Sequence, residues 1–211
     1  MALCEKLISD CIAISCENPV YAGIQSTGWI FNKKDIDEGT VTYATIGTGE
    51  CVKKDPNRVT GITLGTGIKG YQIQQLGKTP FSGTQTEMVE GTNMNTFTNT
   101  VSVLVPDNSS TASHNIIDNL ANGKFVVILA NEYSGSDEAS TYQIFGLNKG
   151  LSASAITNEK YSEDTMGGWA VTLTEENAPV SGVFFWDTDK ATTLGDINAI
   201  VDTCTVGTQC E

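Results

Sequence analysis

The glycines of the segment VTGITLGTGIKGYQIQQL, residues 59–76, constrain the possible folds more than any other feature of the sequence. Gly65, Gly67 and Gly70 match the G-x-G-x-x-G spacing of a dinucleotide-binding loop, which requires a helix to begin at the glycines. Residues 71–76 instead follow the two-residue period of a strand. The sequence therefore predicts a tight hairpin connection, in which glycine supplies positive φ, and no nucleotide cofactor.

Short strand-like runs recur along the rest of the chain, and they favour a mainly β fold with a few short helices (α+β). We predict strands in STGWIF, VTYATI, residues 97–105, KFVVILANEY, STYQIFGLNKGL, GGWAVTLTEENAP and VSGVFFWDTD. NKKDIDEG predicts a charged turn between the first two strands, and residues 47–59 predict a polar, basic loop. The expected architecture is one domain, residues 1–211, with a β-sandwich or barrel core and a flanking helix.

Three segments have helical spacing of their apolar residues. They are residues 3–14, residues 110–124 and residues 192–202. In the second, Thr111 or Ser113 is expected to cap the helix, Ile116, Ile117 and Leu120 to form its inner face, and Gly123 to end it. His114 in its first turn has no acid–base partner nearby in the sequence, so we expect an exposed histidine.

Residues 47–95 form a long polar, β-rich excursion in which large apolar side chains are sparse. Ordering a residue costs on the order of 1–2 kcal/mol, and this composition does not offset that cost within one chain. Excursions of such length in a compact domain are usually functional or disordered. We therefore expect this segment to be mobile in the monomer and to be ordered by a neighbouring subunit through strand addition.

The charge of the chain is uneven, with a formal net charge of −13. Residues 1–105 carry 10 acidic and 8 basic side chains, whereas residues 106–211 carry 15 acidic and only 4 basic ones. Such a surface repels phosphate, which argues against sequence-specific binding of nucleic acid. It is compatible with simple solubility, or with an acidic wall past which nucleic acid slides without binding.

The N-terminal segment and the cysteines indicate the cellular compartment in which the protein folds. Glu5, Lys6 and Asp10 interrupt the N-terminal segment that a secretory signal would need, and no apolar run is long enough for a membrane span, so we expect folding in a reducing cytoplasm. The intervals between the cysteines fall mostly outside those of zinc sites. Reduced cysteines are expected first, and disulfides between the termini second. These six residues are Cys4, Cys11, Cys16, Cys51, Cys204 and Cys210.

No segment carries a recognisable catalytic or metal-binding motif. Asp187-Thr188-Asp189 begins like a calcium loop but has Ala191 at the next ligand position. Glu175 and Glu176 form an acidic pair that we place on a loop, without the burial that general acid–base catalysis requires. The sequence thus predicts neither enzyme activity, nor a metal, nor a cofactor.

Residues 125–189 resemble structural proteins of tailed bacteriophages that infect Bacteroides-type hosts, through FGLNKGL, the strand WAVTLTEENAP and a short strand ending in DTD. The likeness is greatest to tail-tube proteins. It implies a β-sandwich-like core with a flanking helix, and six-membered rings that stack into a DNA-conducting tube. The implied location is the virion, after synthesis in the host bacterial cytoplasm. The implied partners are further copies of the chain, other virion proteins, and DNA that passes without specific binding; no membrane is involved.

An assembly role gives the polar excursion a purpose, because rings pair exposed sheet edges between subunits. We expect the inter-subunit contacts to include a hairpin around the glycines, a basic tip that meets an acidic neighbour, and two apolar side chains. The residues are Gly65, Gly67 and Gly70; Lys53, Lys54 and Arg58; and Phe81 and Met88. A neck-ring or decoration protein, a cell-surface interaction domain and a hydrolase with an unrecognised site remain as alternatives.

Overall fold

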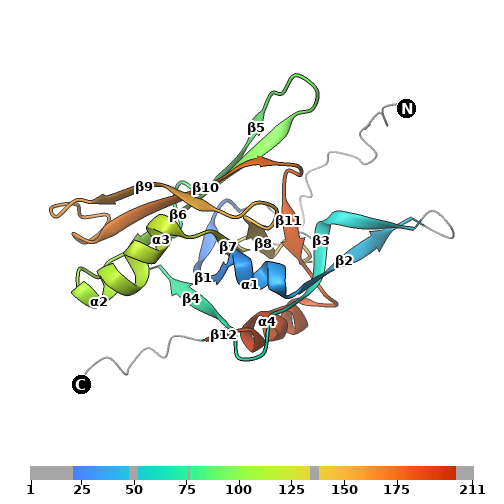
Figure 1. Cartoon of the computed structure of the whole chain (residues 1–211), viewed down its shortest axis with the longest axis horizontal. Coiled ribbons are helices and arrows are strands. Elements are labelled where there is room, and N and C mark those ends of the chain that lie inside the picture. The colour runs from blue at the N-terminus through green and yellow to red at the C-terminus, as the bar shows by residue number, and fades with distance from the viewer. Residues whose placement is uncertain (1–20, 48–51, 76, 134–137, 203–211) are drawn as a thin grey trace.

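A computed structural model describes residues 21–47, 52–75, 77–133 and 138–202, which form two β-sheets with short helices around them (Figure 1). The strands are β1 (Ile24–Asn32), β2 (Thr40–Ile46), β3 (Lys53–Thr63), β4 (Gly70–Gln74), β5 (Gln85–Val89), β6 (Thr96–Val105), β7 (Phe125–Asn131), β8 (Tyr142–Phe145), β9 (Ser152–Asn158), β10 (Trp169–Ala178), β11 (Val183–Phe185) and β12 (Val201–Asp202). The helical segments are α1 (Lys33–Glu38), the continuous stretch α2 (Ser110–Ala112), η2 (Ser113–Ile117) and α3 (Asp118–Asn122), and α4 (Lys190–Ala199). The predicted fold class, mainly β with a few short helices, is confirmed.

The larger sheet has eight strands in the order β12-β4-β1-β7-β8-β11-β3-β2, and the smaller sheet has four in the order β5-β6-β10-β9. Strand β7 lies inside the larger sheet and is buried on both faces, as its apolar run predicts. Val126 and Ile128 belong to one core, which α1 and α4 also enter. Val127 and Leu129 belong to a second core, shared with the smaller sheet. Both cores therefore meet at β7.

The smaller sheet follows the alternation expected from its sequence. In β10, Val171 and Leu173 are buried and face Val103 and Val101 of β6, whereas Thr172 is only partly covered. Period-two alternation of this kind is typical of a strand with one face on a core. The second core therefore lies between this face of the smaller sheet and β7.

The predicted charged turn between β1 and β2 is wrong, because these residues form the helix α1. Lys33 forms an ion pair with Asp37, and Lys34 Nζ lies 3.6 Å from Glu38 Oε1, both at the i, i+4 spacing that supports a helix. Ile36 is buried in the first core. The charged side chains of this segment therefore stabilise a helix and do not indicate a turn.

The predicted hairpin around the glycines is also wrong, since β3 and β4 lie apart in the larger sheet with four strands between them. β3 pairs with β2, and β4 pairs antiparallel with β1. The connection does contain a tight turn, in which Ile68 N donates to Gly65 O at 3.0 Å and Gly67 has a φ of 79°. The strand expected after Gly70 is confirmed as β4, so no helix begins at the glycines.

The predicted loop over residues 47–59 is wrong for its second part, which begins the eleven-residue strand β3. Pro56 is tolerated because the pairing of β3 with β2 is irregular between Val59 and Lys54, and a bulge releases the strand from regular hydrogen bonding. Val59 and Ile62 then enter the first core. The expectation that residues 47–95 add little to the core of the monomer is therefore wrong for β3.

The helix predicted over residues 110–124 is confirmed, with two differences. Ser109 caps it, because its Oγ accepts a hydrogen bond from Ala112 N at 3.1 Å. Its middle part, η2, is π-helical, and that wider winding leaves Ile116 exposed while Ile117 and Leu120 are buried. Gly123 ends the helix, and His114 is exposed, as expected.

The helix expected over residues 192–202 is confirmed as α4 up to Ala199, with the Asp189 side chain accepting from Thr192 N at 2.8 Å as its cap. Its predicted last turn is wrong, because Val201 and Asp202 form β12 beside β4. The helix predicted over residues 3–14 and all six cysteines lie outside the described residues. Across the described ranges, the helices are too short or too polar to cross a membrane.

Candidate assembly interface

Two hairpins extend from the body of the protein, one formed by β2 and β3 and the other by β5 and β6 (Figure 1). Apolar side chains are exposed near both tips: Ile46 and Val52 on the first, and Met88, Val89 and Met94 on the second. Single exposed apolar residues are common on proteins, but groups at the ends of projecting elements point to binding surfaces. These hairpins are the first candidates for contacts with another chain.

The β5–β6 hairpin is the more exposed of the two. β5 is the terminal strand of the smaller sheet, so one of its edges has no neighbour in the described chain. Four of its five residues are exposed, and Thr86 is partly covered. Gly91 N donates to Asn95 Oδ1 at 3.2 Å and closes the turn beyond the strand. A defined strand that is exposed on both faces is a template for pairing with another chain.

The base of this hairpin is fixed to the body by two side-chain hydrogen bonds, one partly buried and one buried. Thr86 Oγ1 donates to Asn99 Oδ1 at 2.7 Å, and Asn99 Nδ2 donates to Glu175 Oε2 at 2.9 Å. The hairpin is thereby held in a defined direction by groups that do not reach its tip. Such preorganisation lowers the ordering cost of an association.

Glu175 is a structural residue whose predicted place on a solvated loop is wrong, because it is 1% exposed. Its Oε1 accepts from Asn148 N at 3.1 Å and Lys149 N at 2.7 Å, and its Oε2 also accepts from Gly146 N at 3.2 Å. The signal was available: the inward positions of β10 are odd-numbered, and Glu175 continues that series. The role of Glu175 is to bind a turn, and it faces hydrogen-bond donors rather than a cavity.

Phe81 and Gly70 do not lie at the surface, and their proposed inter-subunit role is wrong. Phe81 is 1% exposed in the second core, and Gln75 Oε1 accepts from its backbone N–H at 2.8 Å, which holds the left-handed φ of 54°. Gly70 is buried in β4, where an added Cβ would overlap the ring of Phe31. Both residues stabilise the fold of a single chain.

The expected basic tip is divided by the structure. Lys53 and Lys54 lie at the exposed start of β3, with Lys54 Nζ 3.3 Å from the centre of the Tyr43 ring, and burial raises the pKa of that tyrosine. Arg58 lies four positions beyond Lys54, roughly 13 Å along a strand. It is partly buried, and its Nη2 lies 3.5 Å from Asp187 O. Arg58 therefore belongs to the body and not to the tip.

Gly65 and Gly67 lie in the turn that follows β3, where Gly67 is exposed and has no atom within 4 Å of a virtual Cβ. Met88 is 61% exposed on β5, with Asn95 Nδ2 3.5 Å from its sulfur. Of the predicted site residues, Met88 is the one that lies on the exposed edge strand. Val89 and Met94 join it there, and no pattern in the sequence marked them.

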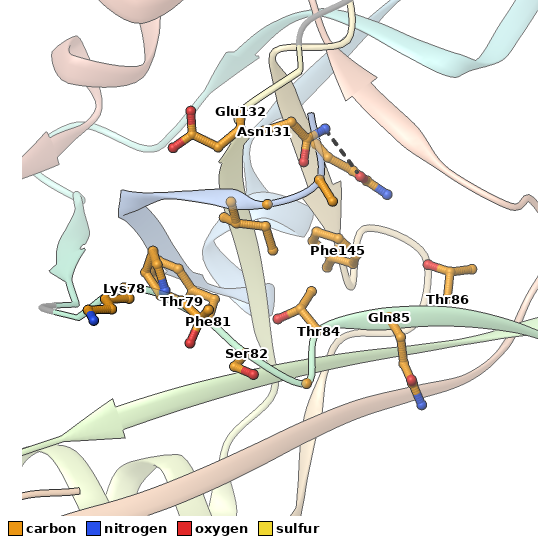
Figure 2. A pocket seen from close by; sticks show the side chains of 16 residues that line it. Lys78, Thr79, Phe81, Ser82, Thr84, Gln85, Thr86, Asn131, Glu132 and Phe145 are labelled. Atoms are coloured by element: carbon orange, nitrogen blue, oxygen red, sulfur yellow. Dashed lines mark hydrogen bonds between the residues drawn. The ribbon is translucent and has the colours of Figure 1, made fainter. Parts of the chain in front are cut away.

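A pocket of about 670 Å³, lined by both polar and apolar residues, lies beside the base of β5 (Figure 2). Residues 78–86 form one wall, and the start of β1 with the ends of β7 and β8 forms the other. Asn131 Nδ2 donates to Gln143 Oε1 at 3.5 Å. Among the described residues that line it, the ionisable side chains are Lys78 and Glu132. This pocket offers hydrogen-bonding groups but no pair of carboxylates for acid–base chemistry.

Comparisons with known proteins leave the chain without relatives to argue from: no protein-family model, curated protein or solved structure matches it. Within the described ranges, no three His, Cys, Asp or Glu side chains come together in a way that would hold a metal ion. The function of the protein must therefore be inferred from the surface of the chain itself.

Proposed function

We propose that the protein is a self-assembling structural protein of a bacteriophage virion, of the tail-tube type, whose subunits form stacked rings around a DNA-conducting channel. The observation that carries the proposal is the β5–β6 hairpin, with a strand edge that no described strand of the chain pairs with, and with exposed Met88, Val89 and Met94. An edge of this kind is a liability for a protein that works as a monomer. In a closed ring, each such edge is covered by the next subunit.

Charge supports the same proposal. The net charge of −13 is concentrated after residue 105, so an assembled ring would present an acidic wall to the DNA backbone. Like charges prevent the phosphates from binding, and DNA then passes without being held. The resemblance to tail-tube proteins covers residues 125–189, and these residues include β7, β8, β10 and β11 at the centre of the fold.

Assembly of the purified protein tests the proposal directly. We expect rings or tubes in negative-stain electron micrographs, and a mass that rises with concentration in light scattering coupled to gel filtration. A protein that stays monomeric at every concentration would refute the proposal. Single rings that never stack would instead favour a neck or decoration protein.

A substitution at the edge strand makes this test specific. Met88→Lys removes an exposed apolar contact whose burial contributes about 1.5–3 kcal/mol, so the concentration for half-assembly should rise by roughly 10- to 150-fold. Met166→Lys is the matched control, because Met166 is 62% exposed and lies outside the hairpin, in the turn before β10. Equal assembly of the Met88→Lys variant and the wild type would show that β5 is not part of the interface.

A further inference from the structure

A large groove lies at the far end of the smaller sheet from the β5–β6 hairpin. Its volume is about 1030 Å³, and it is bounded by β4, by the end of β6 and by the helical stretch η2–α3. Apolar side chains line most of it, including Phe31, Ile73, Val103, Leu120 and Phe125. Tyr71 and Ile116 are exposed at its rim.

The groove is free of formal charge in a strongly acidic protein. None of its described lining residues is Asp, Glu, Lys or Arg, and its polar groups are amides such as Asn115 and Gln72. An occupant must therefore be apolar and nearly uncharged, since a charge placed there would lose its hydration without gaining a counter-charge. Nucleic acid and highly charged peptides do not meet this condition.

The tip of the β5–β6 hairpin has the required chemistry. Between residues 88 and 95 it carries Met88, Val89 and Met94 and a single charged side chain, Glu90. Methionine is flexible and polarisable and fills irregular apolar cavities well. The other projecting hairpin is a poorer match, because Lys53 and Lys54 follow its tip.

The tip and the groove cannot meet within one chain. The tip precedes the first residue of β6, and the groove is lined by Val103, Leu104 and Val105 at the end of that strand. Ten residues of extended chain span roughly 33 Å. Figure 1 shows the β5 hairpin and the α2–α3 stretch at opposite ends of the smaller sheet. Each chain thus presents one projecting tip and one groove that its own tip does not reach.

We propose that the groove between β4, β6 and η2–α3 binds the β5–β6 hairpin tip of a second copy of this chain. The contact is heterologous, with the tip of one copy in the groove of the next, and such contacts close into rings or continue into filaments. This inference rests on the proposed self-assembly and adds the two surfaces that make the contact.

Photo-crosslinking from the hairpin tip tests the contact. A chain that differs from the natural sequence only by benzoylphenylalanine in place of Met94 is prepared with ¹⁴N and, separately, with ¹⁵N. The two preparations are mixed and irradiated, so that peptides joined between two copies can be recognised by mass. We expect crosslinks to peptides that contain residues 71–74 or 115–123. The same probe in place of Met166 should not give these products.

The outcomes separate the two proposals. Crosslinks from the tip to any other surface of an assembled protein would overturn the groove contact and leave self-assembly standing. A protein that neither assembles nor crosslinks would overturn both.

Substitution at the exposed rim gives a second readout without disturbing a core. Ile116→Glu should raise the concentration for half-assembly at least tenfold, as should Met94→Glu at the tip. Tyr161→Glu, at a fully exposed position outside the groove, should change it less than twofold. Unchanged assembly of the Ile116→Glu variant would overturn the groove contact.

Discussion

The buried carboxyl group of Glu175 permits the most quantitative prediction. It is 1% exposed and accepts four hydrogen bonds: three from the backbone N–H groups of Gly146, Asn148 and Lys149, and one from the Asn99 side chain. Gly146 and Gly150, with positive φ, form the turn that this carboxyl group binds. One side chain therefore connects β10, the turn after β8, and the base of the β5–β6 hairpin.

Replacing Glu175 with Gln keeps the shape of the side chain and changes its hydrogen bonding. Each oxygen of Glu175 accepts from two donors, so an amide NH₂ in place of either oxygen leaves two donors without an acceptor. A buried donor without a partner costs about 1–3 kcal/mol. The Glu175→Gln variant should therefore lose about 2–6 kcal/mol of unfolding free energy, a large share of the 5–15 kcal/mol typical of a domain.

Urea denaturation, followed by circular dichroism and tryptophan fluorescence, measures this loss. The scan is made in the Met88→Lys background at low concentration, so that assembly does not add to the apparent stability. Glu176→Gln is the control: its side chain is exposed, and the change should stay within about 0.5 kcal/mol. If Glu175→Gln also stays within about 0.5 kcal/mol with an unchanged m-value, the inferred role of the buried carboxyl group is wrong.

Three further predictions concern single positions. Gly70→Ala should destabilise the protein by about 1–3 kcal/mol in urea denaturation, because the new methyl group overlaps the Phe31 ring. Gly195→Ala should stabilise it by about 0.5–1 kcal/mol in the same assay, since Gly195 lies inside α4 with no atom within 4 Å of the added Cβ. The backbone N–H of Thr192 lowers the pKa of the Asp189 cap. Its contribution is present above the unfolded-state pKa of about 3.9 and is lost as the pH falls through the folded-state value, so Asp189→Asn should flatten the acid decline of the melting temperature.

The strands could be predicted from the sequence where the local pattern decides the structure. The run 125–130 is apolar at every position because β7 contacts a core on each face, and β10 alternates because only one of its faces does. The pairing of the strands, in contrast, could not be predicted from the local sequence. The turn after β3 has the glycines of a hairpin, but β2 and β1 provide the partners of β3 and β4, and local sequence does not record this choice.

The character of residues 47–95 was misjudged for a related reason. The number of apolar residues in a segment gives the apolar surface that the segment contributes. It does not show how much of that surface other parts of the chain bury. Val59, Ile62 and Phe81 are few, but each is buried against strands distant in sequence. The stretch whose large apolar side chains stay exposed is shorter and runs along β5 to the turn before β6. Its exposed methionines could not be distinguished from core methionines by sequence alone.

The contacts that hold the fold and the proposed assembly contacts lie in separate parts of the hairpin, which makes the proposed function testable without unfolding the protein. The network of Thr86, Asn99 and Glu175 crosses the base of the hairpin, and the second core begins with Val101, beyond that network. Met88 and Met94 lie on the opposite side of it, where the described chain buries neither residue. Substitutions at the tip should therefore change association and leave unchanged the urea midpoint measured at concentrations too low for assembly, whereas Glu175→Gln should change both, because it loosens the base that directs the tip. A tip variant that unfolds with the body would show that the hairpin belongs to the folding unit, and the separation argued here would fail.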